Sequence, residues 1–389
     1  KSNFKKVIAA VMALVMMFGL TACSGANYTE NNTEYVIGVS GPLTGAAAVY
    51  GVAVQNSAQM AVDEINAAGG LNGVMLKLVA TDDTHDATKV AANYASMLES
   101  GMQVSLGTVT TAPGVEFTGL SKEDNVFFIT PSATGDDIPE NSNGYQMCFA
   151  DSNQGAVSAE VFNETYADKT VGVFFKSDDE YSVGIYNNFK ANLDKSFGDI
   201  SAATASFTGE ASTFDSQIQL LKDCEVVFMP SYYTPASQFM TQAMNVDNSI
   251  AVYYGCDGFD GIDAIEGFDI NTVKQEVSYL SHFNSTATEG PAAEFIAKYT
   301  EKFGADTLNQ FGASAYDCVY AIYGAMKKAI DEGKEIPVTI SASDLCEILK
   351  KQFNGGFTYS GNTGDNIKWQ STGFVDKTAL AYVIKEANK

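Results

Sequence analysis

The sequence predicts an α/β protein of two lobes, each a doubly wound parallel sheet, joined by a three-strand hinge. Short strand-like apolar runs alternate with segments of helical periodicity from Tyr35 onward, a rhythm typical of parallel sheets with helices on both faces. The rhythm restarts after residues 145–150. The chain also has 389 residues, which is long for one hydrophobic core.

Each half is assembled from the same kinds of element. In the first half, the apolar run 35–40 predicts a buried strand, and apolar residues at steps of three and four across 54–68 predict a helix. The same reasoning places further strands and helices, in chain order, at 74–80, 90–97, 104–107, 126–129, 170–175, 181–197, 226–229, 235–244 and 250–254. A helical stretch at 291–330 is expected to pack back on the first lobe. The tail 357–384 is expected to form strands and turns.

The N-terminus has the pattern of an export signal. Three lysines flank an apolar run at 7–20, which is shorter than the about 20 residues that span a bilayer. A basic start, a short apolar core and small residues after it predict a signal peptide over 1–22, with a buried core helix as the alternative. The residues Leu20-Thr21-Ala22-Cys23 resemble a bacterial lipobox, so Cys23 is expected to carry acyl chains that anchor the protein to the membrane.

Residues 23–34 are polar and are expected to form a flexible tether. No other long apolar segment follows, so the rest is expected to be soluble and outside the cytoplasm. The predicted domains are 1–22 and 23–34, then 35–150 with 284–354 as lobe 1, and 151–283 with 355–389 as lobe 2. The chain is expected to cross between the lobes near Ala150, Phe283 and Asn354.

The charge and the reactive residues exclude several classes of function. The net charge of −24 excludes nucleic acid as a partner and argues against anionic lipid surfaces. All basic residues are lysines, which disfavours a ligand with several negative charges, because bidentate clamps are normally made by arginine. The two histidines lie far apart, and the cysteines after Cys23 have no metal spacing. We therefore expect no metal, no cofactor and no enzymatic triad.

The loops after the strands carry the candidate binding residues, because ligands of such sheets sit at the carboxyl ends of the strands. Loops of the first half are rich in hydroxyls and lie beside helix starts, which suits a carboxylate without a cation. Loops of the second half add aromatic rings and the carboxylate of Asp257. Together they predict an α-amino acid site in the cleft between the lobes.

Several stretches in series resemble the branched-chain amino acid (Leu/Ile/Val) substrate-binding lipoproteins of ABC importers, which have the periplasmic binding protein type I fold. They are IGVSGPLTG at 37–45, AVDEINAAGGLNG at 61–73, VATDD at 79–83, FFITPSAT at 127–134 and FGASAYD at 311–317. The resemblance extends from Tyr35 to the end of the chain. It implies a monomeric binding protein that delivers a small neutral amino acid to a permease.

The resemblance also implies roles for particular residues. Thr111 would bind the ligand carboxylate, and the carbonyl of Ser132 would accept from the ligand ammonium. Thr134 would contact both groups, and Asp257 would pair with the ammonium, although a Glu is common there. Aromatic lids and the side-chain pocket would be formed by Tyr50, Tyr181, Tyr232 and Phe311.

One departure concerns a pocket wall. Where some relatives carry a disulfide, this chain has His85 and Thr110, so the ligand need not be branched-chain. A helix-capping role for Thr110 is an equal alternative, and His85 is expected in a loop rather than against the ligand. The same fold binding an amide, urea or an aromatic acid, or serving as a sensor module, stays open. An exported hydrolase is disfavoured because no GxSxG is present.

Overall fold

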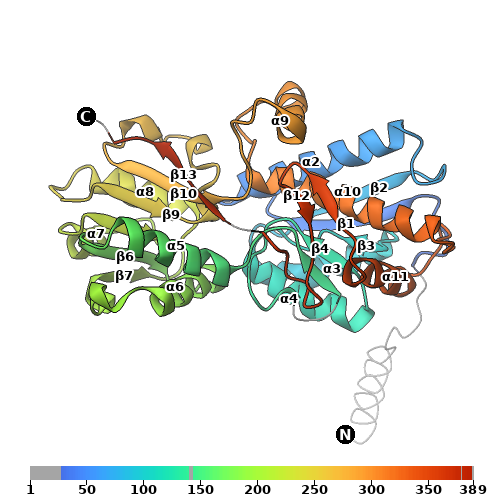
Figure 1. Cartoon of the computed structure of the whole chain (residues 1–389), viewed down its shortest axis with the longest axis horizontal. Helices are drawn as coiled ribbons and strands as arrows, with labels where there is room; N and C mark the ends of the chain where they lie inside the picture. Colours follow the sequence, from blue (N-terminus) through green and yellow to red (C-terminus); the bar gives the residue numbers. More distant parts are fainter. Residues whose placement is uncertain (1–27, 140–142, 378, 388–389) are drawn as a thin grey trace, which may run out of the picture.

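The computed structural model describes residues 28–139, 143–377 and 379–387, so the predicted signal peptide and Cys23 lie outside the described residues. Two lobes lie side by side (Figure 1), each with a central sheet covered by helices. The predicted fold class is therefore confirmed. Within the described ranges, no helix is long and apolar enough to cross a membrane.

The first lobe is a five-stranded parallel sheet in the order β2-β1-β3-β4-β5. Its strands are β1 (Tyr35–Gly41), β2 (Leu76–Asp82), β3 (Val104–Ser105), β4 (Phe128–Thr130) and β5 (Gly144–Gln146). Its helices are α2 (Ala48–Ala67), α3 (Val90–Glu99), α4 (Thr111–Asp124), α9 (Gly290–Phe303), α10 (Gln310–Asp331) and α11 (Ala342–Asn354). All seven residues of β1 are buried, as expected for a strand covered on both faces.

The second lobe is a six-stranded sheet in the order β13-β10-β9-β8-β6-β7. Its strands are β6 (Val171–Lys176), β7 (Thr204–Phe207), β8 (Val226–Met229), β9 (Val252–Gly255), β10 (Glu276–Ser281) and β13 (Leu380–Lys385). Its helices are α5 (Asp151–Thr165), α6 (Glu180–Asn192), α7 (Asp215–Leu221) and α8 (Tyr233–Ala243). Only the edge strand β13 is antiparallel within the described sheet. Closely packed aromatic rings make up much of the hydrophobic core of this lobe.

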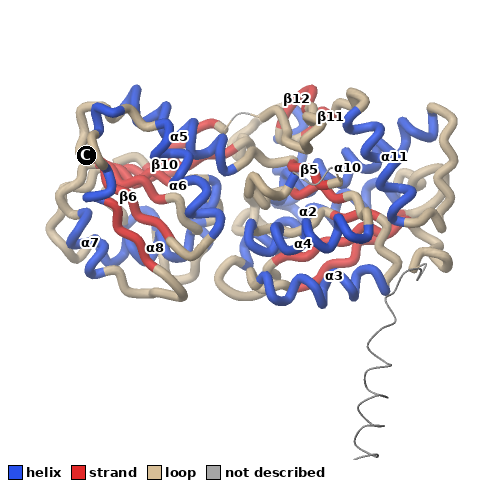
Figure 2. The backbone as a smooth tube through the Cα atoms, turned by 90° about the horizontal axis from the view of Figure 1, so that it is seen from below, coloured by secondary structure: helices blue, strands red, loops and turns tan. Residues whose placement is uncertain are grey.

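The tail after α11 differs from the prediction that 355–389 belongs to lobe 2. The hairpin of β11 (Tyr359–Gly361) and β12 (Gly364–Ile367) packs on α10 of the first lobe (Figure 2). The indole of Trp369 then donates to the carbonyl of Gln146, 2.8 Å away, at the end of β5. Only β13 joins the second sheet. The third crossing therefore follows Lys377 and does not lie near Asn354.

A buried carboxylate explains this position of the tail. Asp317 of α10 accepts hydrogen bonds from the hydroxyls of Tyr359 and Thr363 and from the backbone N–H groups of Asn362 and Thr363, at 2.6–3.0 Å. A buried carboxylate needs such donors, and the hairpin supplies them. The other two crossings lie between Gln146 and Asp151 and between Ser281 and Gly290.

The described cysteines do not form disulfides. Cys148, Cys224, Cys256, Cys318 and Cys346 are all free and buried. They act as small apolar side chains of the core, as the scattered spacing predicted.

Candidate ligand-binding site

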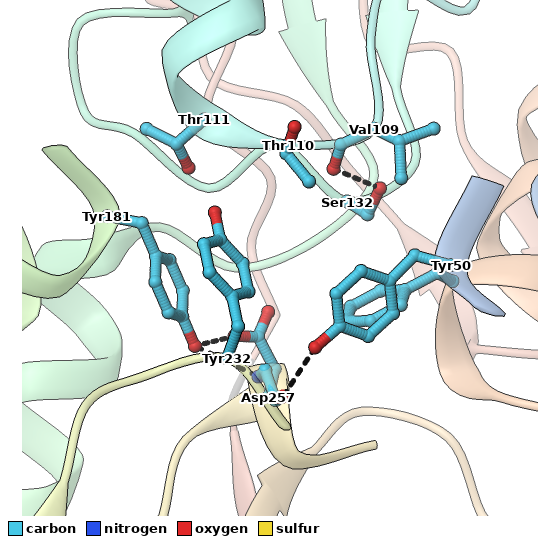
Figure 3. A pocket seen from close by; sticks show the side chains of 10 residues that line it. Tyr50, Val109, Thr110, Thr111, Ser132, Tyr181, Tyr232 and Asp257 are labelled. Carbon is cyan, nitrogen blue, oxygen red and sulfur yellow. Dashed lines mark hydrogen bonds between the residues drawn. The ribbon is translucent and has the colours of Figure 1, made fainter. Parts of the chain in front are cut away.

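A small pocket lies between the lobes, at the carboxyl ends of the strands (Figure 3). Its own side chains nearly fill it, because the free space is about 10 Å³, which is room for no more than a water molecule. All predicted site residues except Thr134 line it, together with Val109 and Gly258; the full lining is Tyr50, Val109, Thr110, Thr111, Ser132, Tyr181, Tyr232, Asp257, Gly258 and Phe311. The two residues that were not predicted are sequence neighbours of Thr110 and Asp257, so they lie in the same two loops that the sequence identified.

The first-lobe wall is formed by hydroxyls and a helix start. Thr111 is the first residue of α4, where unpaired backbone N–H groups and the helix dipole favour a negative group. The hydroxyl of Ser132 donates to the carbonyl of Val109 at 2.7 Å, which holds that loop in place. This wall can accommodate a carboxylate without any lysine or arginine.

The sequence left the role of Thr110 open, whereas the resemblance implied that Thr134 contacts both ends of the ligand. Thr110 occupies the N-cap position of α4, but its hydroxyl makes no capping hydrogen bond and instead pairs with His85 Nδ1 at 2.9 Å. Thr134 lies behind Thr111, with their hydroxyl oxygens 3.5 Å apart. Its carbonyl accepts from the backbone N–H of Asp151, so Thr134 also braces the first crossing between the lobes.

The opposite wall carries Asp257, which is 1% exposed. The phenol of Tyr181 donates to Asp257 Oδ1 at 2.7 Å, and the backbone N–H of Asp257 donates to Gln154 Oε1 at 3.0 Å. Burial raises the pKa of Asp257 to about 6, and the hydrogen bonds from Tyr181 and Gln154 oppose this rise. A cationic group in the pocket would offset the cost of burying this charge. No sequence pattern singled out Gln154.

Aromatic rings close the sides of the pocket. Tyr181 and Tyr232 are stacked with ring centroids 4.6 Å apart, and Tyr50 meets Phe311 edge-on at 4.9 Å. Tyr233, next to Tyr232 in the chain, is buried against the ring of Tyr50. The rings provide an apolar surface for an aliphatic side chain.

The two lobes touch across the cleft, so the pocket is closed. The phenol of Tyr50 in the first lobe donates to the carbonyl of Gly258 in the second. The hydroxyl of Thr234 donates to the carbonyl of Ala46 at 2.9 Å, and Asp260 Oδ2 accepts from the first N–H of α10, on Gln310, at 2.8 Å. Fold and site together are those of a two-lobe ligand-binding protein whose site lies between the lobes.

The chain belongs to the periplasmic binding protein family, whose model matches residues 34–370. It is 27% identical over 329 residues to the Leu/Ile/Val-binding protein BraC3 of Rhizobium johnstonii, covering 79% of this chain and 86% of the relative. It is 26% identical to the leucine-, isoleucine-, valine-, threonine- and alanine-binding protein of Pseudomonas aeruginosa, covering 81% and 84%.

Solved structures share the fold. The branched-chain amino acid transporter substrate-binding protein LivJ of Streptococcus pneumoniae, in complex with isoleucine, has a TM-score of 0.76 at 24% identity, covering 92% of this chain and 99% of that one. A solute-binding protein of an ABC transporter from R. palustris, in complex with benzoate, has a TM-score of 0.76 at 16% identity, covering 91% and 94%.

Ligand affinity is expected to fall at acid pH through Asp257. Because burial raises its pKa to about 6 in the empty site, the carboxylate is fully present only above that pH, and only then could it pair with a ligand ammonium. Below it, affinity should fall by up to about tenfold per pH unit. Calorimetric titration of the protein with an amino acid that it binds, repeated from pH 4.5 to 8, measures the dissociation constant at each pH. The Asp257→Asn variant should lose this acid dependence; constant affinity of the parent down to pH 4.5 would contradict the assignment.

Removing the phenol of Tyr50 is expected to weaken binding by about 5- to 100-fold. Tyr50→Phe deletes the hydrogen bond to Gly258 and leaves a buried carbonyl unpaired, which costs about 1–3 kcal/mol. Because this contact joins the lobes, the loss falls on the closed, ligand-bound state. Tyr253→Phe is the matched control, since the phenol oxygen of Tyr253 is buried without a hydrogen-bond partner among the described residues. Equal affinities in both variants would rule out the closing role.

Proposed function

We propose that this chain is the extracytoplasmic substrate-binding protein of an ABC importer, that it binds a small neutral amino acid between its lobes, and that it delivers this ligand to the permease without catalysing a reaction. One observation carries the proposal. The buried carboxylate of Asp257 and the hydroxyl-rich start of α4 at Thr111 face the same closed pocket from opposite walls. The proposal includes a monomer anchored through acyl chains on Cys23.

The pocket has one group for each end of a zwitterion. The α4 start and Ser132 suit the carboxylate, Asp257 suits the ammonium, and the rings suit the side chain. The relatives named above for Leu, Ile and Val, and the neighbour with bound isoleucine, support an aliphatic ligand. An aromatic acid such as the benzoate of the R. palustris neighbour would leave Asp257 buried without a cation, which is costly. An amino acid is therefore favoured.

Calorimetry of the refolded, ligand-free protein tests the proposal. The panel is the twenty amino acids with benzoate, urea and short amides. Binding of neutral aliphatic amino acids, with no heat from the corresponding carboxylic acids that lack the amino group, is the expected result. Binding of benzoate or an amide with no response to any amino acid would overturn the amino-acid proposal and would leave the family membership unchanged.

A further inference from the structure

A second, larger cavity, partly open to solvent, shares one lining residue with the ligand pocket. It has about 220 Å³ of free space and is lined from the first lobe by Ala46, Ala47 and His85 and from the second by residues including Lys176, Glu210 and Gln238. Tyr232 lines both spaces. The Tyr232 ring is therefore part of the wall between the pocket and this outer cavity.

Three neighbouring rings contact Tyr232, and the most distant is Tyr50, with ring centroids 6.0 Å apart. Tyr181 stacks on one face with an interplanar angle of 16°. The ring of His85 meets Tyr232 edge-on, with centroids 5.0 Å apart and planes at 80°. His85 is itself fixed by its hydrogen bond to the hydroxyl of Thr110, a residue of the ligand pocket. The pair His85–Thr110 thus links the pocket wall to the ring that divides the two cavities.

The backbone conformation of Thr84 and His85 is fixed by hydrogen bonds. Thr84 and His85 both have positive φ, at 53° and 63°, a conformation that costs side-chain-bearing residues energy. It is held by the carboxylates of Asp82 and Asp83, which accept from the N–H groups of Thr84 and His85, each at 2.9 Å. Two buried or partly buried carboxylates hold this loop in its strained conformation. The loop therefore fixes the position of the His85 ring.

Tyr232 reduces the space left for a ligand. Its phenol points toward the start of α4, near Thr110 and Thr111 (Figure 3), and its oxygen is buried without a hydrogen-bond partner among the described residues. The free space beside the ring is only about 10 Å³, room for no more than a water molecule, so a ligand enters only when the lining side chains move. A ligand carboxylate at α4 would supply the missing partner of the phenol, while a bulky side chain would compete with the ring for space.

We propose that His85 is a specificity-determining positioning residue, which holds Tyr232 as the partition between the two cavities and so limits the ligand to compact aliphatic amino acids. This inference rests on the proposed function. Without His85, the Tyr232 ring can turn toward the outer cavity, where Lys176, Glu210 and Gln238 offer its hydroxyl polar partners. The two spaces then join, and a longer or aromatic side chain fits.

The ratio of the dissociation constants for phenylalanine and valine tests this, measured by calorimetry. The parent should bind valine more tightly, and His85→Ala should shift the ratio toward phenylalanine by at least about tenfold, the scale at which pocket walls discriminate side chains. Thr110→Ala should shift it in the same direction, and Thr110→Ser, which keeps the hydroxyl, should restore it. Ser212→Ala, which changes another residue of the outer cavity lining, is the matched control.

Other results would overturn the inference. Loss of affinity for both ligands in equal proportion would assign His85 only a structural role, and a parent that binds phenylalanine as tightly as valine would remove the size limit. If His85→Ala does not fold, Thr110→Ala carries the same test with the histidine in place. A parent that binds no amino acid fails the proposed function itself, so the two failures are distinguishable.

Discussion

Replacing Asp257 with alanine is expected to weaken amino-acid binding by about 200- to 5,000-fold. The side chain is 1% exposed and is the carboxylate of the pocket lining, so its loss leaves the ligand ammonium buried without a counter-charge. Removing one partner of a buried charge pair costs about 3–5 kcal/mol, which corresponds to this loss of affinity. Calorimetry on the ligand-free protein measures it directly.

Two further variants separate charge from shape in this test. Asp257→Asn keeps the size and the acceptor for the Tyr181 phenol but removes the charge, so it should lose most of the same affinity. Asp263→Ala changes an exposed carboxylate six residues along the same segment and should bind like the parent. If Asp257→Ala bound as tightly as Asp263→Ala, the ammonium would have to lie elsewhere.

Replacing Asp317 with alanine is expected to lower the free energy of unfolding by about 3–5 kcal/mol. The buried carboxylate accepts its hydrogen bonds from the β11–β12 hairpin, and Lys377 donates to the Thr363 hydroxyl in the same cluster at 2.6 Å. Burial lowers the pKa of Lys377 to about 8. Without Asp317, several buried donors and a nearby ammonium lose their partner, which is strongly destabilising.

Urea unfolding followed by tryptophan fluorescence measures this effect. Trp369 is the single tryptophan of the chain and packs against Phe353 next to the same hairpin, so it reports on the region affected. Asp365→Ala removes an exposed carboxylate of the hairpin and should change stability by less than about 1 kcal/mol. An Asp317→Ala variant as stable as Asp365→Ala would show that the hairpin does not depend on this anchor.

Local sequence patterns predicted most of the fold and nearly the whole pocket lining. Strand–helix alternation predicts parallel sheets, and parallel sheets place the loops after their strands at one edge. Thr111 and Asp257 could therefore be assigned to one cleft although they lie far apart in the chain. The strands β5, β7 and β10 and the helices α5, α7 and α11 were not predicted. The signals were present for some of them, since β7 alternates polar and apolar residues and α11 has Leu345, Leu349 and Phe353 at helical spacing on its buried face.

The sequence by itself determined the fold class, the family resemblance and the chemistry of the two pocket walls, because these depend on periodicity and on residue types at strand ends. Tertiary structure alone decided that the hairpin 359–367 belongs with α10, that Gln154 supports Asp257, and that His85 packs against Tyr232. Each of these rests on side-chain contacts between residues 42 to 147 positions apart. Such contacts leave no local pattern, because they form only when distant elements are brought together by packing.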